Sequence, residues 1–357
     1  MSTLRVNTLQ NTSTTDGGIS INNSGHITMD NVAYPSAGPL SNRNLIINGA
    51  MQVAQRSTAA VNNSSSVSTL TYETIDRWGY WASAGSDFSV QQSSDAPSGF
   101  GNSVKITSLA ATSLSSTSYY TIAQRIEAQN LYSTDIGTST AKDLTLSFWV
   151  KASNAATYSV YALSGNYAES FTSTYTVNSA NTWERKTITI PGATSGFSAT
   201  GNSAQLEVGF SFGAGSSYST STLNQWQTSN FKVNASSATN LVETNAAELY
   251  ITGVQLEVGS VATPFEHRSY GDEMARCQRY YYRTETSNKN IHATFYGGST
   301  YICQVWLPVY MRAAPSVTLS GGNASDATIA EAGRYGFAWY KTSASSYVQQ
   351  ITASAEL

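Results

Sequence analysis

The chain has 357 residues, of which 40% are hydrophobic and only 11% are charged, against about 25% charged residues in typical globular proteins. Serine and threonine together make up about a quarter of it, and aromatic residues reach 11%, with 22 tyrosines and 7 tryptophans. The aromatic content excludes a disordered chain. The formal net charge of −3, with no run of lysines or arginines, excludes a nucleic-acid binder that relies on a basic surface.

Residues 1–42 differ from the rest and form an N-terminal arm. Isoleucines at 19 and 21 and apolar residues at 27 and 29 alternate with polar ones on either side of an Asn-Ser-Gly turn, which predicts a β-hairpin. A Pro- and Gly-containing stretch, 34–39, follows as a linker. A segment of about 40 residues with so few apolar side chains cannot stabilise a core alone. We therefore expect the arm to pair with copies of itself or with another protein.

Residues 43–268 read as a succession of short strands separated by Gly, Asn, Pro and Ser clusters. Period-2 alternation predicts strands at 104–106, 120–126, 144–150, 158–161, 186–190, 206–212 and 248–252. Eight to ten strands over about 220 residues fit one antiparallel sandwich of jelly-roll type. The fold class we expect is therefore all-β.

Residues 269–357 begin with a helix, predicted over 270–281, and continue as a small β domain. Acidic residues open the helix and arginines follow toward its end, in line with the helix dipole. Met274, Cys277 and Tyr281 would share its apolar face. Strands are predicted at 293–296, 301–308, 316–319 and 336–340. This domain is small for a self-sufficient sandwich, so we expect it to lean on symmetry-related copies.

Catalytic and metal sites find little support. His26, His267 and His292 lack the spacing of metal ligands, and we interpret His267 as part of a structural turn. The two cysteines, Cys277 and Cys303, are expected to be free thiols, the first of them buried. No Gly-x-Ser-x-Gly elbow or calcium-binding loop occurs. We therefore expect no catalytic residue, no metal and no cofactor.

A pair of carboxylates could support glycoside hydrolysis, but no spacing favours one pair. The candidates are Glu127, Asp135, Glu169, Glu207, Glu248 and Glu257. Glu207, Glu248 and Glu257 each alternate with apolar residues, which indicates solvated strand faces instead.

Aromatic side chains remain the best candidates for recognition, since rings stack on apolar sugar faces while hydroxyls and amides meet the polar edges. The candidate receptor-binding residues are Tyr296, Tyr301, Tyr335, Tyr340 and Tyr347. The competing interpretation is that half or more of them fill β cores.

Several stretches, in this order, resemble virion fibre proteins of tailed bacteriophages that carry a carbohydrate-binding-module-like β-sandwich. They are 2–11 (STLRVNTLQN), 42–56 (NRNLIINGAMQVAQR), 74–78 (TIDRW), 145–151 (TLSFWVK), 249–259 (LYITGVQLEVG), 262–271 (ATPFEHRSYG) and 277–281 (CQRYY). The resemblance covers residues 1–30 and 42–282, and only a vague pattern extends it beyond.

The resemblance implies a homotrimeric tail fibre, with residues 1–42 attaching to tail or capsid proteins of the particle and the distal end meeting the host. Leu4, Val6 and Leu9 are the candidate attachment residues. The partner at the other end would be a host cell-surface glycan or protein, with no nucleic acid and no membrane insertion. Folding would occur in the host cytoplasm, since the N-terminus shows no secretory signal, and the protein would end in the virion. The resemblance to fibre proteins transfers no catalytic residue and no sugar-contact motif to this sequence.

Two alternatives stay open. One is a fibre-borne glycan depolymerase, which would need a carboxylate pair in a cleft. The other keeps the virion assignment but places the protein on the capsid as a decoration or head fibre.

Overall fold

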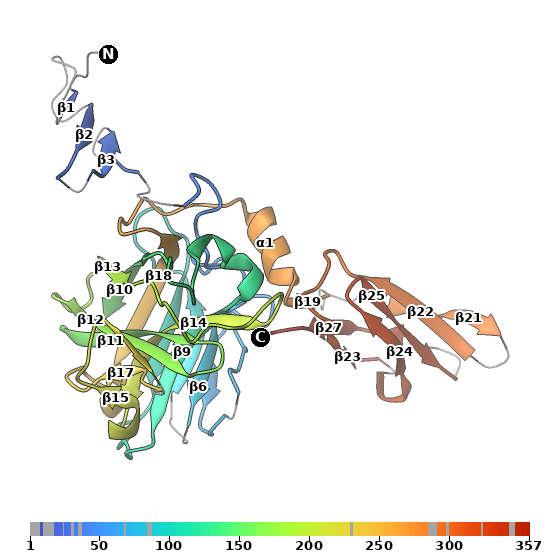
Figure 1. Cartoon of the computed structure of the whole chain (residues 1–357). Coiled ribbons are helices and arrows are strands. Elements are labelled where there is room, and N and C mark those ends of the chain that lie inside the picture. Colours follow the sequence, from blue (N-terminus) through green and yellow to red (C-terminus); the bar gives the residue numbers. More distant parts are fainter. Residues whose placement is uncertain are drawn as a thin grey trace, which may run out of the picture.

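The computed structural model describes residues 8–9, 18–23, 25–29, 32–34, 38–67, 69–83, 88–228, 231–284, 291–297, 300–322, 324–342 and 347–357. It is nearly all β, as predicted, with a central sandwich from which an N-terminal arm and a C-terminal domain project on different sides (Figure 1). In the described part of the chain, no helix is long and apolar enough to cross a membrane.

The N-terminal arm is a four-stranded antiparallel sheet of β1 (Thr8–Leu9), β2 (Ile19–Ile21), β3 (Ile27–Met29) and β4 (Val32–Ala33). The predicted hairpin is confirmed, because Ile19 pairs with Met29 and Ile21 with Ile27. The attachment candidates Leu4 and Val6 lie outside the described residues.

Two six-stranded sheets form the sandwich, in the orders β13-β10-β18-β8-β7-β5 and β16-β12-β11-β14-β9-β6. The first contains β5 (Val61–Asn63), β7 (Phe88–Ser93), β8 (Ser103–Ser108), β10 (Leu144–Ala152), β13 (Glu184–Ile190) and β18 (Glu248–Val258). The second contains β6 (Gly79–Ala82), β9 (Tyr119–Glu127), β11 (Ala156–Ser164), β12 (Glu169–Val177), β14 (Ala204–Ala214) and β16 (Trp226–Thr228). The chain crosses repeatedly between the sheets, as in a jelly roll.

The sandwich has more strands than the eight to ten expected. Edge strands such as β5 and β16 span only three residues, too few to show alternation. The small remaining elements of the sandwich are the parallel pair β15 (Ser219–Thr220) and β17 (Asn234–Ala235), and the 3-10 turns η1 (Ala128–Asn130), η2 (Tyr132–Thr134), η3 (Ser216–Tyr218) and η4 (Leu241–Glu243). A fifth turn, η5 (Ala324–Asp326), belongs to the C-terminal domain.

The core lies between the sheets and is rich in aromatic rings. Phe148 of β10 meets Phe210 of β14 and Tyr175 of β12, with ring centroids 4.9 and 5.0 Å apart in edge-to-face geometry. Such pairs add to the free energy of hydrophobic burial. Much of the tyrosine content is therefore structural.

The expectation of solvated faces for Glu207 and Glu257 is wrong, because each carboxylate is buried under another segment. Glu207 accepts hydrogen bonds from Arg125 Nε at 2.9 Å and Tyr161 Oη at 3.0 Å. The segment that contains β15 and β17 covers this outer face of the second sheet. Glu257 accepts from the backbone N–H and the hydroxyl of Thr263, at 2.9 and 2.6 Å. Glu248, half-buried, pairs with Lys105 at 2.6 Å.

Two of the segments that carry the fibre resemblance, 42–56 and 74–78, are joined through Asn48. The Asn48 side chain donates to the carbonyls of Val53 and Asp76 at 2.8 and 2.9 Å. The Asn48 N–H donates to Glu273 of the helix at 2.6 Å. These polar residues therefore fix the entry and exit of the sandwich rather than form an open site.

The helix α1 (Tyr270–Gln278) ends earlier than predicted, because residues 281–283 already form β19 (Tyr281–Arg283). Ser269 caps it by accepting from the Asp272 N–H at 3.2 Å. The predicted apolar face is wrong in part: Glu273 and Cys277 are buried while Met274 is half-buried. The hydrogen bond from Asn48 satisfies the Glu273 carboxylate and turns this face inward.

The C-terminal domain contains three small sheets. One is β19-β27-β23, with β23 (Ser316–Ser320) and β27 (Gln350–Ser354); another is β20 (Ile291–His292) with β26 (Tyr347–Val348). The third has the order β21-β22-β25-β24, with β21 (Thr294–Gly297), β22 (Thr300–Trp306), β24 (Thr328–Gly333) and β25 (Gly336–Lys341). The core of this domain is formed by Phe337, Trp339, Val348 and Ile351.

After β27 the chain returns to the sandwich and ties the two domains together (Figure 1). Glu356 forms ion pairs with Arg56, at 3.1 Å, and with Arg77. The Arg77 guanidinium, fully buried, also lies 3.5 Å from the ring centroid of Tyr280. Arg312 donates to the carbonyls of Ala355 and Asn202, both at 2.8 Å. Within this chain, ion pairs and hydrogen bonds of buried or half-buried charged side chains thus hold the C-terminal domain against its own sandwich.

Candidate ligand-binding groove on the C-terminal domain

A groove lies on the outer face of the sheet β21-β22-β25-β24. The register pairs Trp306 with Gly336 and Gln304 with Ala338 across β22 and β25. Glu331 of β24 pairs with Ala338 from the other side. Because side chains alternate along strands, these residues share one face, while Cys303, Val305 and Trp339 turn toward the core.

Small residues in the central strand make the floor of this groove. Gly336 and Ala338 lie between the larger side chains of β22 and β24, and the resulting cavity measures about 220 Å³. At Gly336 an added Cβ would lie 2.4 Å from the carbonyl oxygen of Val305. The floor therefore has to remain glycine at this point for the strands to pair as they do.

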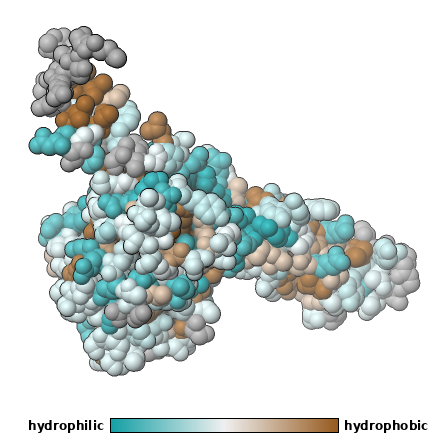
Figure 2. All heavy atoms as spheres, in the orientation of Figure 1, coloured by the Kyte–Doolittle hydropathy of each residue, from teal (hydrophilic) through white to brown (hydrophobic). Residues whose placement is uncertain are grey.

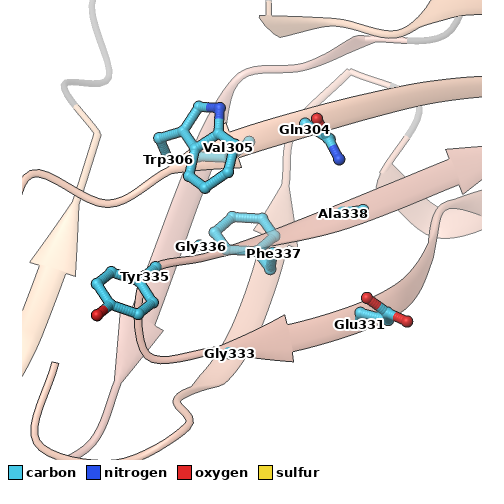
Figure 3. A pocket seen from close by; sticks show the side chains of 9 residues that line it. All are labelled: Gln304, Val305, Trp306, Glu331, Gly333, Tyr335, Gly336, Phe337 and Ala338. Carbon is cyan, nitrogen blue, oxygen red and sulfur yellow. The ribbon is translucent and has the colours of Figure 1, made fainter. Parts of the chain in front are cut away.

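Two aromatic side chains stand at the rim with most of their surface in water. Trp306 is 75% exposed and Tyr335 is 65% exposed. Figure 3 shows Trp306 over the Gly336 end of the groove and Tyr335 in the β24–β25 hairpin, with Gln304 and Glu331 on opposite sides of Ala338. Because most of its surface is in water, the Trp306 indole is available for contact with a ligand.

The hairpin that carries Tyr335 is held in place from behind. Tyr310 meets the Tyr335 ring edge to face at a centroid distance of 4.2 Å. The Arg334 guanidinium stacks 3.9 Å from the Tyr310 ring centroid and donates through Nε to the Met311 carbonyl at 2.7 Å. The Leu307 N–H donates to the Tyr335 carbonyl at 2.8 Å. The rim is therefore preorganised, which reduces the entropy lost on binding.

The chemistry of the groove is that of hydrogen bonding and stacking. Among the nine residues that line it, Glu331 supplies the one ionisable carboxylate and Gln304 an amide that both donates and accepts. Two rings, one carboxylate and one amide suit a ligand with a flat apolar face and several hydroxyl or amino groups. Across the described residues, no cluster of three or more His, Cys, Asp or Glu could hold a metal ion.

The five tyrosines singled out from the sequence do not form one site. Tyr335 lines the groove, whereas Tyr296, also exposed, lies on β21 and is not among the lining residues. Tyr301, Tyr340 and Tyr347 are half-buried, and the Tyr347 ring packs 5.6 Å from His292.

Sequence reasoning did not select Trp306, Gln304 or Glu331. The only local signal was a tryptophan at the end of a predicted strand, just before Leu307-Pro308.

The weaker catalytic candidates take structural places. His267 packs against Phe100 and Phe265, with ring centroids 5.2 and 4.9 Å away. Cys277 is a fully buried free thiol, as expected, and burial raises its pKa well above the ordinary value. Cys303 is also free and lies on a strand.

Fold and groove define a class: a modular, nearly all-β protein with an aromatic-rimmed groove on a small domain that is tied to a large sandwich. A scan against protein-family models finds no match, and a search of curated proteins finds none either.

Solved structures show distant likenesses. The chain is similar to the enzymatically active domain of tailspike protein 4 of bacteriophage CBA120, with 13% identity, a TM-score of 0.31 and coverage of 60% of this chain but only 21% of that one. It is also similar to the carbohydrate-binding module TmCBM61 in complex with β-1,4-galactotriose, with 8% identity, a TM-score of 0.31 and coverage of 61% and 99%. A third similar structure is the family 11 carbohydrate-binding module of a Clostridium thermocellum cellulosomal cellulase, with 15% identity, a TM-score of 0.28 and coverage of 57% of this chain and 100% of that one. TM-scores of this size do not establish a shared function.

Proposed function

We propose that this chain is a structural fibre protein of a tailed-bacteriophage virion, anchored to the particle through residues 1–42 and recognising the host surface through its C-terminal domain. The proposal combines the ordered sequence motifs with one structural observation, the exposed apolar face of the N-terminal sheet in its described residues.

That apolar face consists of side chains that a single chain leaves in water. Leu9, Ile19, Ile21, Ile27 and Met29 are each between 36% and 54% exposed, and Figure 2 shows the hydrophobic residues of the arm on its surface. On the opposite face the hydroxyls of Ser20 and Thr28 hydrogen-bond to each other across the strands. A sheet this small with one apolar face gains stability by docking that face on a partner.

The partner in this proposal is a further copy of the arm together with a tail or capsid protein of the particle. A homotrimer would present three C-terminal domains at once, so that weak contacts with the host would add up through avidity. In this proposal the protein is not an enzyme and resides in the virion after assembly in the host cytoplasm.

The test is a double variant, Ile21→Ser with Ile27→Ser, which removes one cross-strand apolar pair. Leu109→Ser is the matched control, since Leu109 is also exposed, at 43%, but belongs to the sandwich. We expect the double variant to melt at the wild-type temperature, to lose the trimer in native mass spectrometry and to be missing from purified particles. Incorporation at the wild-type level would overturn the proposal.

Two further measurements separate the alternatives. Antibody labelling of intact particles distinguishes a tail fibre from a capsid decoration. Accumulation of reducing ends from host polysaccharide would favour a depolymerase.

A further inference from the structure

We propose that the groove above β22, β25 and β24 binds one or two pyranose rings of a neutral or amino-substituted glycan and rejects acidic ones. This inference rests on the proposed function, because it names the ligand class of the host-recognition domain. Trp306 is the stacking platform, and Gln304 and Glu331 bind the hydroxyl or amino groups.

The first argument is the free space over the floor. Trp306 lies directly across from Gly336, and Gln304 across from Ala338, so no side chain larger than a methyl group occupies the centre of the groove. A sugar ring could therefore lie flat against the indole, where its C–H groups meet the negative face of the aromatic system.

The second argument is size. A cavity of about 220 Å³ lies below the range of about 300–1,000 Å³ typical of sites for drug-sized ligands. It therefore suits one or two sugar rings, at the end of a glycan or within it, rather than a folded peptide segment. In addition, Trp306 belongs to β22, an interior strand of its sheet, so a peptide could not pair with its backbone as an added strand.

The third argument is charge. Glu331 contributes the one charged side chain of the lining, and no lysine or arginine belongs to it. The nearby Arg334 is held against Tyr310 and the Met311 carbonyl. A uronate or sialate would bring a second carboxylate toward Glu331 without a compensating cation, whereas an ammonium group would be attracted.

The experiment measures binding of three trisaccharides, of glucose, glucosamine and galacturonic acid, to the full-length protein by saturation-transfer NMR and tryptophan fluorescence. We expect the glucose or the glucosamine trisaccharide to bind, with single-site dissociation constants of about 1 mM, and the galacturonic acid trisaccharide not to bind. Trp306→Ala should weaken binding by about tenfold or more. Tyr132→Ala is the control, since Tyr132 is similarly exposed, at 67%, but lies on the sandwich.

Glu331→Gln tests the charge argument on its own. The substitution keeps the size of the side chain but removes its negative charge, so the ratio of the affinities should shift toward the galacturonic acid trisaccharide and away from the glucosamine trisaccharide. Both substituted side chains are exposed, and unchanged melting temperatures will show that the fold is intact.

The inference is overturned if none of the three sugars binds, if Trp306→Ala binds them as the wild type does, or if the acidic sugar is preferred. Particle assembly is scored separately. If sugar binding fails while the protein still joins virions, the ligand class is wrong and the fibre assignment stands. If virions carrying Trp306→Ala lose adsorption although the wild type binds no sugar, the groove binds a host protein instead.

Discussion

The buried ion pair between Arg77 and Glu356 should dominate the stability of the joint between the two domains. Burial disfavours the charged guanidinium, but Glu356 and, to a smaller extent, Tyr280 and Tyr72 together more than offset this, so the pKa of Arg77 lies above its ordinary value. In Glu356→Ala the charged Arg77 would keep only the Arg125 carbonyl, at 2.7 Å, and the face of the Tyr280 ring.

Breaking a buried pair by removing one partner costs about 3–5 kcal/mol. We expect the lower end, about 3 kcal/mol, because these two contacts remain and Arg56 still has Asp76 at 3.9 Å. For a cooperative unit of 150–250 residues, this lowers the melting temperature by about 6–12 °C. Differential scanning calorimetry at neutral pH measures the shift.

The control is Lys142→Gln, which removes an exposed pair. Lys142 lies 3.0 Å from Asp135, and the two side chains are 43% and 40% exposed, so the loss should stay below about 1 kcal/mol. A second variant, Arg77→Met with Glu356→Gln, removes the unpaired charge and should recover part of the loss. The reasoning fails if Glu356→Ala melts within about 2 °C of the wild type, or if the double variant is no more stable than the single one.

Three further outcomes follow from buried groups. Burial raises the pKa of Asp76 to about 6. Because this folded-state pKa lies above the unfolded-state pKa, the stabilising contribution of Asp76 is present below about pH 4 and is lost as the pH rises through 6. In urea titrations over this pH range, the wild type should therefore lose roughly 3 kcal/mol of unfolding free energy relative to Asp76→Asn. Gly209→Ala would place a methyl group 2.5 Å from the Tyr161 ring and should cost about 1–3 kcal/mol in urea unfolding, whereas Gly101→Ala, which meets nothing within 4 Å, should be neutral. A thiol reagent at pH 8 should label Cys277 only after unfolding, and mass spectrometry of the native protein showing rapid labelling would contradict its burial.

Alternation along the chain was sufficient to find most long strands, because a side-chain period of two survives wherever one face is apolar. It could not say how each polar face is covered. Glu207 lies on the outer face of the sheet, as its position predicts, yet the segment with β15 and β17 lies over that face and Arg125 neutralises the charge. That covering segment is distant in sequence and carries no periodic signal, so the burial of Glu207 is a tertiary fact.

The groove shows a second property that the sequence alone does not reveal, namely which aromatic side chains are exposed. Trp306 and Trp339 both belong to strands of one sheet in the C-terminal domain, yet the first is mostly exposed and the second fully buried. The register decides this, since Trp306 faces Gly336 while Trp339 faces Cys303 on the core side, and a slip of one residue would exchange the two faces. Without the strand pairing, the sequence alone could not separate exposed from buried aromatic residues. The tyrosines chosen from it therefore include three that are half-buried, and the exposed Trp306 was not chosen. Trp306 is therefore a candidate for recognition because it lies opposite a glycine, Gly336, on the neighbouring strand. This arrangement depends on the pairing of β22 with β25, which the sequence alone does not reveal.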